Sequence, residues 1–245
     1  MHLAALLAAL LITAIVGAFV ISTSTMRGAR AQVPQGQDAI YITGCMNITS
    51  PGYYVISTNI TGLQAAGYCI GVFASDVVIN GSGHWLIGSK QGVGIYVAPG
   101  STNVTIEDVA VTSYYGGILV NSSGVRMVES TVSGNNWFDV NINGNNDFIA
   151  NSTVTVSGNN WFDVNVFGSY DSIVDSNVSG DVYFNGNNDS IVKSTVSGNY
   201  WYGVYFNGNN DSIVSSKVSD NQGYGVYVFG SYDSIVSSNV SGNSV

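Results

Sequence analysis

The sequence repeats one turn and one short apolar segment at nearly constant spacing. The stretch NGNNDSIV occurs at 185–192 and at 207–214, and the related stretch FGSYDSIV occurs at 167–174 and at 229–236. Every copy places an aspartate two residues before an isoleucine. A chain built from equivalent units folds each of them in the same way, so the repeat limits the fold to a few repeat architectures.

Alignment of the units gives three columns of equivalent residues. The first advances in steps of 21, 22, 24, 18, 22 and 22 residues, through Val104, Val125, Asp147, Asp171, Asp189, Asp211 and Asp233. The second holds Val111, Val132, Val156, Val178, Val196, Val218 and Val240. The third pairs apolar residues two apart, from Ile118 and Val120 to Val226 and Val228. We expect the extra Thr-Val at 153–156 to form a bulge or a longer strand, whereas the 18-residue unit lacks the NNWF loop.

Each unit of roughly 22 residues thus holds three short segments with alternating apolar residues, and none shows a helical period. Three strands leave no room for a crossover helix, so each strand pairs with its equivalent one unit on, ~4.8 Å away. We predict an all-β fold, a right-handed single-stranded parallel β-helix with three short strands per coil. The chain is 45% apolar, and stacking the coils buries those residues in one continuous core.

Composition divides the chain into four segments. Residues 1–31 are predicted to be a signal peptide, because 3–22 is an uncharged apolar run and Ala29-Arg30-Ala31 fits a small-x-small cleavage pattern. The alternative is an uncleaved membrane anchor. The remaining segments are a linker at 32–37, an irregular N-terminal cap coil at 38–75 and the β-helix repeats at 76–245.

Charge and cysteine content bear on location and partners. Lys and Arg number 6 against 15 Asp and Glu, so nucleic acid and anionic lipid are disfavoured as partners and cations are attracted. Cys45 and Cys69 are the only cysteines, which suits one disulfide in an exported protein, with two buried thiols as the alternative. We expect a secreted or cell-surface glycoprotein that meets a membrane only through an uncleaved N-terminal segment. Its Asn-x-Ser/Thr sequons lie at Asn47, Asn59, Asn80, Asn103, Asn121, Asn151, Asn177, Asn188, Asn210 and Asn239.

Three stretches carry a resemblance to a known superfamily. GCMNITSPGYYVIS at 44–57, CIGVFASDVVINGSGHWLIG at 69–88 and GIYVAPGSTNVTIEDVAVTS at 94–113 resemble the NosD-like, pectate-lyase-like parallel β-helix proteins. That superfamily includes CASH-type repeat proteins and archaeal cell-surface and S-layer-associated proteins. The resemblance covers roughly residues 40–245 and implies a right-handed parallel β-helix. Its motifs are specific to the fold and say little about function.

The aspartate column departs from the superfamily pattern, in which the equivalent position is usually Asn. Each of these residues follows a Gly-containing turn, where an Asp side chain accepts hydrogen bonds from turn N–H groups. We therefore interpret the column as turn capping at an exposed corner. The alternative is a row of Ca²⁺ sites lined by Asp, Asn and carbonyl oxygens, and Ca²⁺ is the only cofactor that the sequence suggests. The column comprises Asp147, Asp171, Asp189, Asp211 and Asp233.

A second column brings further carboxylates to the start of the third strand. Asp139, Asp163 and Asp181 occupy a position that is otherwise Gly or Cys. We expect them to share a face with nearby aromatic side chains. Aromatic rings beside polar groups suit the binding of a sugar, so this face is a candidate carbohydrate site. The alternative is that the rings only cover neighbouring coils. The aromatic candidates for carbohydrate binding are Trp137, Trp161, Trp201, Tyr183, Tyr205 and Tyr227.

Catalysis has few groups to draw on. A lyase resembling the superfamily's members needs a basic residue near its carboxylates, but Arg126 and Lys193 belong to a different strand from Asp139, Asp163 and Asp181. A hydrolase could use paired carboxylates on adjacent coils, roughly 5 Å apart. Copper delivery, which the resemblance also suggests, requires clusters of His, Met or Cys that the sequence lacks.

These observations favour an exported cell-surface β-helix with a structural, adhesive or carbohydrate-interaction role. Its expected partner is an extracellular glycan or another cell-envelope component. The alternative function is a polysaccharide lyase or glycoside hydrolase that acts through Asp139, Asp163 and Asp181. The final residues, SSNVSGNSV at 237–245, end without a recognisable cap, so we also expect end-to-end self-association.

Overall fold

The computed structural model describes residues 38–155 and 163–245. The predicted signal peptide (1–31) and linker (32–37) lie outside the described residues, as does Trp161. The regular elements of the described ranges are all β-strands. None of the described residues forms a helix that is long and apolar enough to cross a membrane.

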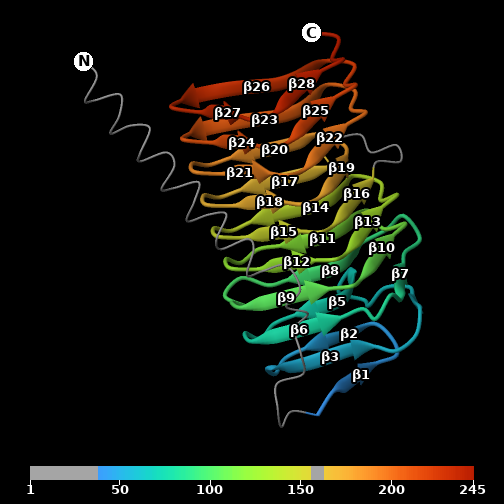
Figure 1. The fold of residues 1–245 in the computed structure, drawn as a ribbon. Coiled ribbons are helices and arrows are strands. Elements are labelled where there is room, and N and C mark those ends of the chain that lie inside the picture. The colour runs from blue at the N-terminus through green and yellow to red at the C-terminus, as the bar shows by residue number, and fades with distance from the viewer. Residues whose placement is uncertain (1–37, 156–162) are drawn as a thin grey trace. The chain divides into compact units, whose positions relative to one another are not determined.

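The strands form three parallel sheets, here named A, B and C, whose neighbouring members come from successive coils (Figure 1). Sheet A contains β1 (Ile40–Ile42), β3 (Gly52–Ile56), β6 (Val77–Asn80), β9 (Val104–Glu107), β12 (Arg126–Val128), β15 (Phe148–Ala150), β18 (Ser172–Val174), β21 (Ser190–Val192), β24 (Ser212–Val214) and β27 (Ser234–Val236). Sheet B contains β2 (Met46–Ile48), β5 (Tyr68–Val72), β8 (Val93–Val97), β11 (Gly116–Val120), β14 (Phe138–Asn143), β17 (Val164–Phe167), β20 (Val182–Asn185), β23 (Tyr202–Asn209) and β26 (Tyr224–Ser231). Sheet C contains β4 (Ile60–Thr61), β7 (Trp85–Ile87), β10 (Ala110–Thr112), β13 (Thr131–Ser133), β16 (Thr153–Thr155), β19 (Asn177–Ser179), β22 (Thr195–Ser197), β25 (Lys217–Ser219) and β28 (Asn239–Ser241).

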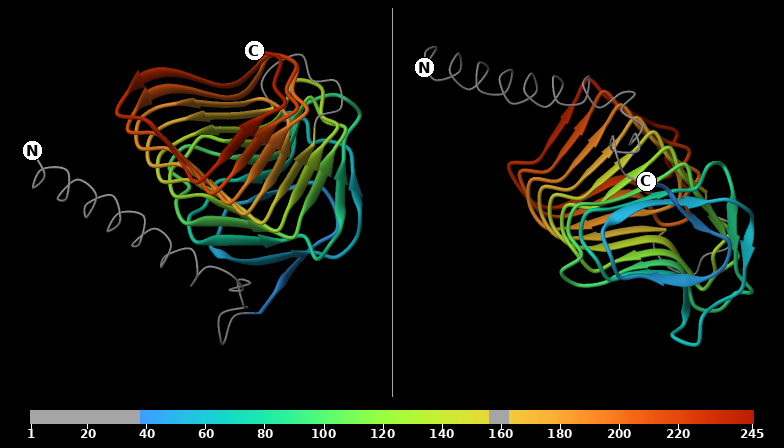
Figure 2. Two further views of the ribbon diagram at one scale, coloured as in Figure 1. Left: turned by 45° about the horizontal axis from the view of Figure 1, so that its top comes forward. Right: turned by 90° about the horizontal axis from the view of Figure 1, so that it is seen from below.

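Each coil passes through sheet A, then sheet C, then sheet B before the next coil begins (Figure 2). The pairing is parallel throughout, and it places equivalent residues of the repeat opposite one another. Ile191, for example, pairs with Ile173 on one side and with Ile213 on the other. The predicted all-β parallel β-helix with three strands per coil is confirmed.

One member of the predicted valine column is wrong. Val154, and not Val156, pairs with Val132 and Val178, and it is fully buried. Strand β16 ends at Thr155, so the additional residues of the 24-residue unit follow the strand. Strand β16 has three residues, like the neighbouring strands of sheet C, so it is not the longer strand that the sequence suggested, and Val156 lies outside the described residues.

The interior consists of columns of apolar side chains that run from coil to coil. Ile106, Ile149 and Ile191 are at most 1% exposed, and β-branched side chains of this kind pack well on a pleated surface. Phe184 and Phe206 stack inside the core with their ring centroids 5.3 Å apart. Burial of each such side chain contributes about 1.5–3 kcal/mol to the stability of the fold. A single coil could not bury these side chains alone.

The first coil contributes the edge strands of sheets A and B. Strand β1 pairs with β3 and strand β2 pairs with β5, so the segment 38–75, predicted to be a cap coil, is joined to the solenoid by backbone pairing. The sulfur atoms of Cys45 and Cys69 are bonded, in the pairing that the sequence predicts. This disulfide fastens the start of β2 to β5 in the next coil.

Three turns close every coil, and they are named here by the sheets that they join. From β9 onward the A–C turn has two residues, of which the first has a positive φ, as at Lys193 with 50°. The B–A turn contains the first aspartate column, and the residue before each aspartate also has a positive φ, as at Asn188 with 63°. The C–B turn varies in length, from residues 180–181 in the shortest coil to 198–201 in the next.

Candidate functional site

The first aspartate column lies inside the B–A turn and not at an exposed corner. Asp147, Asp171, Asp189 and Asp211 are only 1–2% exposed, and Asp233 in the final coil is half-buried. The expectation of an exposed corner was wrong, because the aspartate side chain continues the inward column that Val104 and Val125 begin. Both of these valines are buried as well.

Each aspartate caps the backbone of the coil before it. One carboxylate oxygen, Oδ1, accepts a hydrogen bond from the backbone N–H of the equivalent residue one coil earlier. The donor and acceptor pairs are Val125 to Asp147 (2.6 Å), Asp147 to Asp171 (2.8 Å), Asp171 to Asp189 (2.9 Å), Asp189 to Asp211 (2.9 Å) and Asp211 to Asp233 (2.8 Å). The aspartates therefore do accept hydrogen bonds from turn N–H groups, as the capping interpretation states. Each bond, however, joins two successive coils instead of closing one turn.

Calcium does not fit this column. Ca²⁺ takes about 6–8 oxygen ligands, whereas each coil offers one carboxylate whose Oδ1 already accepts a backbone hydrogen bond. Within residues 38–155 and 163–245, no group of three or more His, Cys, Asp or Glu side chains could hold a metal ion. We therefore derive no role for Ca²⁺ at these aspartates.

Burial strongly favours the neutral form of these carboxyl groups. It raises the pKa of Asp147 and Asp171 to about 7, of Asp189 to about 8 and of Asp211 to about 6. The backbone N–H groups that bind each carboxylate lower the pKa, but by less than desolvation raises it. Adjacent aspartates in the column raise the pKa further at Asp171, Asp189 and Asp211 through charge repulsion.

The second aspartate column is also buried. Asp139 is 0%, Asp163 4% and Asp181 8% exposed, so these carboxylates do not share the outer surface with the aromatic rings as we expected. Oδ1 of Asp139 accepts hydrogen bonds from the side-chain and backbone nitrogens of Asn135, at 2.6 and 3.3 Å. The placement gives no support to catalysis by this column.

Asp163 and Asp181 bind backbone groups of the neighbouring coils. Oδ2 of Asp163 accepts from the N–H of Asp181 at 3.0 Å, and Oδ1 of Asp181 accepts from the N–H of Tyr202 at 3.3 Å. Burial raises the pKa of Asp181 to about 6, opposed by hydrogen bonds from the N–H groups of Tyr202 and Trp201. We had not expected such burial here. In the shortest coil the C–B turn consists of residues 180–181 only, and Asp181 supplies the polar side chain that binds the next coil.

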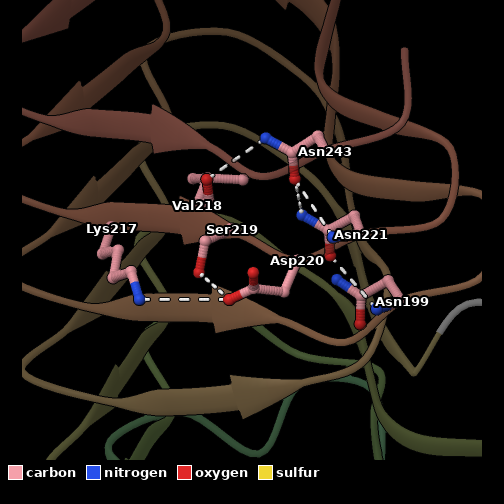
Figure 3. Close-up of polar contacts among 7 residues, drawn as sticks. All are labelled: Asn199, Lys217, Val218, Ser219, Asp220, Asn221 and Asn243. Carbon is pink, nitrogen blue, oxygen red and sulfur yellow. Dashed lines mark hydrogen bonds and ion pairs between the residues drawn. The ribbon is translucent and has the colours of Figure 1, made fainter.

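The sequence reasoning missed two further polar ladders, one in each of the other turns. At the C–B turn, the N–H of Asn199 donates to Oδ1 of Asn221, and the N–H of Asn221 donates to Oδ1 of Asn243, both at 3.1 Å (Figure 3). At the A–C turn, each buried serine accepts from the coil before it, as Oγ of Ser216 does from the N–H of Ser194 at 3.1 Å. The same repeat period would have revealed both ladders, had the alignment been extended to polar positions.

A tyrosine column covers the outer face of sheet B. The ring centroids of Tyr183 and Tyr205 are 5.0 Å apart, as are those of Tyr205 and Tyr227. Beside them, Tyr202 stacks on Tyr224 with centroids 5.7 Å apart. These rings pack on one another and so cover neighbouring coils, although Tyr227 and Tyr224 in the last coil remain 37% and 43% exposed.

Other aromatic residues project from the C–B turn and remain open to solvent. Trp137 is 36% exposed and stacks on Tyr115, with ring centroids 5.9 Å apart and an interplanar angle of 7°. Tyr200 and Trp201 are each 66% exposed. We call these four residues the corner aromatic set. Tyr115 and Tyr200 were not among the sequence candidates, although they occupy the same turn as the predicted tryptophans.

The fold and its turns define a parallel β-helix protein, and the comparisons with known structures agree. The A-module of the Azotobacter vinelandii mannuronan C-5 epimerase AlgE6 superposes with a TM-score of 0.54 at 16% identity, over 85% of this chain and 69% of that one. The A-module of AlgE4, a mannuronan C-5 epimerase of the same organism, gives 0.50 at 14% identity, over 85% and 88%. At such identities the likeness shows the fold alone. No protein-family model and no curated protein matches the sequence.

Proposed function

We propose that this protein is an exported, cell-surface β-helix that binds an extracellular glycan against the corner aromatic set. The observation that carries the proposal is the exposure of Tyr200 and Trp201 at 66% each, together with the stacked Tyr115 and Trp137 in the C–B turns of two earlier coils. Apolar residues that cluster on a protein surface mark interaction sites, whereas single exposed ones do not. Their flat faces suit the apolar faces of sugar rings, and the surrounding amides suit the hydroxyl groups.

The charge of the chain indicates which glycans fit. Eight of the 15 acidic residues are buried, so the described surface carries few charges, and its seven remaining acidic residues outnumber its four basic ones. Such a surface offers no basic patch that would hold a polyanion. A neutral polysaccharide, or one that carries amino sugars, is therefore the favoured partner. This preference differs from the one implied by the names of the two structural neighbours, which are epimerases of mannuronan.

Two further observations support a surface role. The sequence resembles NosD-like and CASH-type repeat proteins, whose members include archaeal surface proteins, and its first 31 residues have the composition of a signal peptide. The described surface is rich in Asn, Ser and Tyr, which provide hydroxyl and amide groups without charge. Such a surface suits adhesion to carbohydrate as well as a structural place in the cell envelope.

The binding test compares matched aromatic substitutions. The double variant Trp137→Ala/Trp201→Ala removes exposed rings from the corner aromatic set, whereas Tyr232→Ala removes a ring that is 87% exposed at the B–A turn. Affinity electrophoresis against neutral, amino-sugar and acidic polysaccharides would measure binding. We expect the double variant to lose at least ~10-fold in affinity, equivalent to about 1.4 kcal/mol, while the control keeps the wild-type value.

Two results would overturn the proposal. One is a wild-type protein that binds none of the polysaccharides. The other is equal loss of affinity in Tyr232→Ala and in the double variant, since that would point to nonspecific contact. Circular dichroism of each variant confirms that the β-helix is intact.

A further inference from the structure

We propose that the buried aspartates of the B–A turn are neutral carboxylic acids, each donating a hydrogen bond from Oδ2 to a turn carbonyl oxygen one coil earlier, which belongs to Ser122 for Asp147 and to a glycine for the others. The solenoid is thereby stabilised in acidic surroundings and loosened in alkaline ones. This inference does not depend on the proposed glycan binding, which concerns a different turn.

The first observation is the uneven use of the two carboxylate oxygens. Oδ1 accepts a backbone hydrogen bond in every coil, as described above. The Oδ2 atoms of Asp147, Asp171, Asp189 and Asp211 are buried without a hydrogen-bond partner. An ionised carboxylate would leave this oxygen charged, dehydrated and unpaired, which is costly, whereas a carboxylic acid has a proton there to donate.

The second observation is an acceptor that lies beside each of these oxygens. A Cβ atom on Gly186 would lie 1.2 Å from the carbonyl oxygen of Gly168 and 3.1 Å from Oδ2 of Asp189. The same arrangement recurs one coil on, where a Cβ atom on Gly208 would lie 1.4 Å from the oxygen of Gly186 and 3.1 Å from Oδ2 of Asp211. Carboxyl and carbonyl oxygens therefore lie close together, and a proton between two such acceptors converts repulsion into a hydrogen bond.

No basic group offsets the carboxylates within the described part of the chain. The charged groups that act on the column are its own members: Asp147 on Asp171, Asp171 and Asp211 on Asp189, and Asp233 on Asp211. Near its C-terminal end the column is lined by apolar side chains such as Phe206 and Val228 and by the uncharged hydroxyl groups of Ser231 and Ser234. Ionisation of one aspartate therefore makes ionisation of the next less favourable.

The pH dependence follows from the direction of the pKa changes. In the folded protein the pKa of these four aspartates lies at about 6 to 8, above the ordinary value of 3.8. A group with a raised folded-state pKa contributes stability that is fully present below its unfolded-state pKa. That contribution is lost progressively as the pH rises above the ordinary value of 3.8, and the loss is complete once the pH exceeds the folded-state values of about 6 to 8.

The principal experiment is urea unfolding of the full chain at pH 4, 6 and 8. We expect the unfolding midpoint of the wild type to fall markedly between pH 4 and pH 8. In the variant Asp147→Asn/Asp171→Asn/Asp189→Asn/Asp211→Asn the fall should become much smaller, because the amide keeps the Oδ1 acceptor and donates from Nδ2 at every pH. Asp181 remains and accounts for a residual slope. The control Asp220→Asn changes an exposed carboxylate and should keep the wild-type slope.

A direct reading of protonation completes the test. Infrared spectroscopy at pH 6 should show the C=O band of carboxylic acids in the wild type, and a weaker band in the quadruple variant. If that variant does not fold, the single variant Asp189→Asn serves for both measurements. Equal pH slopes in wild type and variant, or ionised aspartates at pH 5, would overturn the proposal. So would recovery of wild-type stability at pH 8 on adding Ca²⁺, since it would identify a cation in place of the proton.

Discussion

The side chains of individual residues decide how closely the coils of this solenoid can stack. At the B–A turn the glycines are as restrictive as the aspartates, because the carbonyl oxygen of one glycine lies where the Cβ atom of the next would be. Gly168, Gly186, Gly208 and Gly230 all show this contact, at 1.2 to 1.5 Å from the position of an added Cβ. The glycines of NGNN and FGSY are thus required by stacking, not by an unusual φ.

Substitution of one of these glycines should be severely destabilising. We expect Gly186→Ala to lower the free energy of unfolding by about 3 kcal/mol or more, because backbone atoms must move to admit the methyl group. Gly44→Ala is the matched control, since nothing lies within 4 Å of its added Cβ. Urea unfolding measures both. An unchanged unfolding midpoint for Gly186→Ala would contradict this, because it would show that adjacent coils can move apart to admit the methyl group at little cost in stability.

Single residues were also where the sequence was least informative. The period located Asp147 to Asp233 correctly but could not say whether they point inward, because side-chain direction at a turn does not follow the alternation of a strand. Asp139 and Asp163 were placed on the outer surface for the same reason, yet both are buried. The exposed Tyr115 and Tyr200 were not predicted, although they lie in the same turn of the repeat as Trp137 and Trp201.

Among the elements, the turns are as regular as the strands. Serine, asparagine and aspartate ladders occupy the three turns, and each ladder accepts backbone N–H groups of the preceding coil. Buried N–H groups outside the strands thereby find acceptors. Strand pairing was predictable from the apolar columns, whereas the polar ladders are visible only when equivalent turn residues are compared.

The serine ladder gives a prediction of its own. Oγ of Ser194 accepts from the N–H of Ser176 at 3.1 Å and donates to the carbonyl of Val192 at 2.9 Å. We expect Ser194→Ala to cost about 1–3 kcal/mol, because it leaves a buried N–H group without this acceptor. Ser241→Ala, at an exposed position of β28, should cost little. Chemical denaturation compares the two, and equal effects would contradict a ladder role for Ser194.

At the scale of the whole molecule, strand pairing joins only neighbouring coils, and this is why the architecture could be predicted so fully. The residues of one unit meet their equivalents one unit away, so the apolar period alone specifies three sheets and their register. The exception is Val154, where two valines spaced by two residues both satisfied the pattern. The unequal C–B turns could not be assigned from a constant period.

Removal of one complete coil should therefore leave a folded protein. Deletion of residues 189–210 joins Asn188 to Asp211 and restores the motif NGNNDSIV, with every column kept in register. We expect a β-rich circular dichroism spectrum, cooperative unfolding and somewhat lower stability. Deletion of 189–201 removes β21 and β22 but keeps β23, so two strands of sheet B follow one another without the strands of sheets A and C, and we expect an unfolded chain. A folded product from both deletions would refute the stacking rule.

The C–B turn also differs from the other two in how much its length varies. Sheets B and C keep their pairing across the short connection at 180–181 and the longer one at 198–201. A foreign peptide inserted between Gly198 and Trp201 would thus be attached to a regular solenoid, and the choice of coil would set its position along the solenoid axis. Several such insertions, one per coil, would hold their peptides in a row at a spacing of ~4.8 Å, a geometry useful for multivalent display.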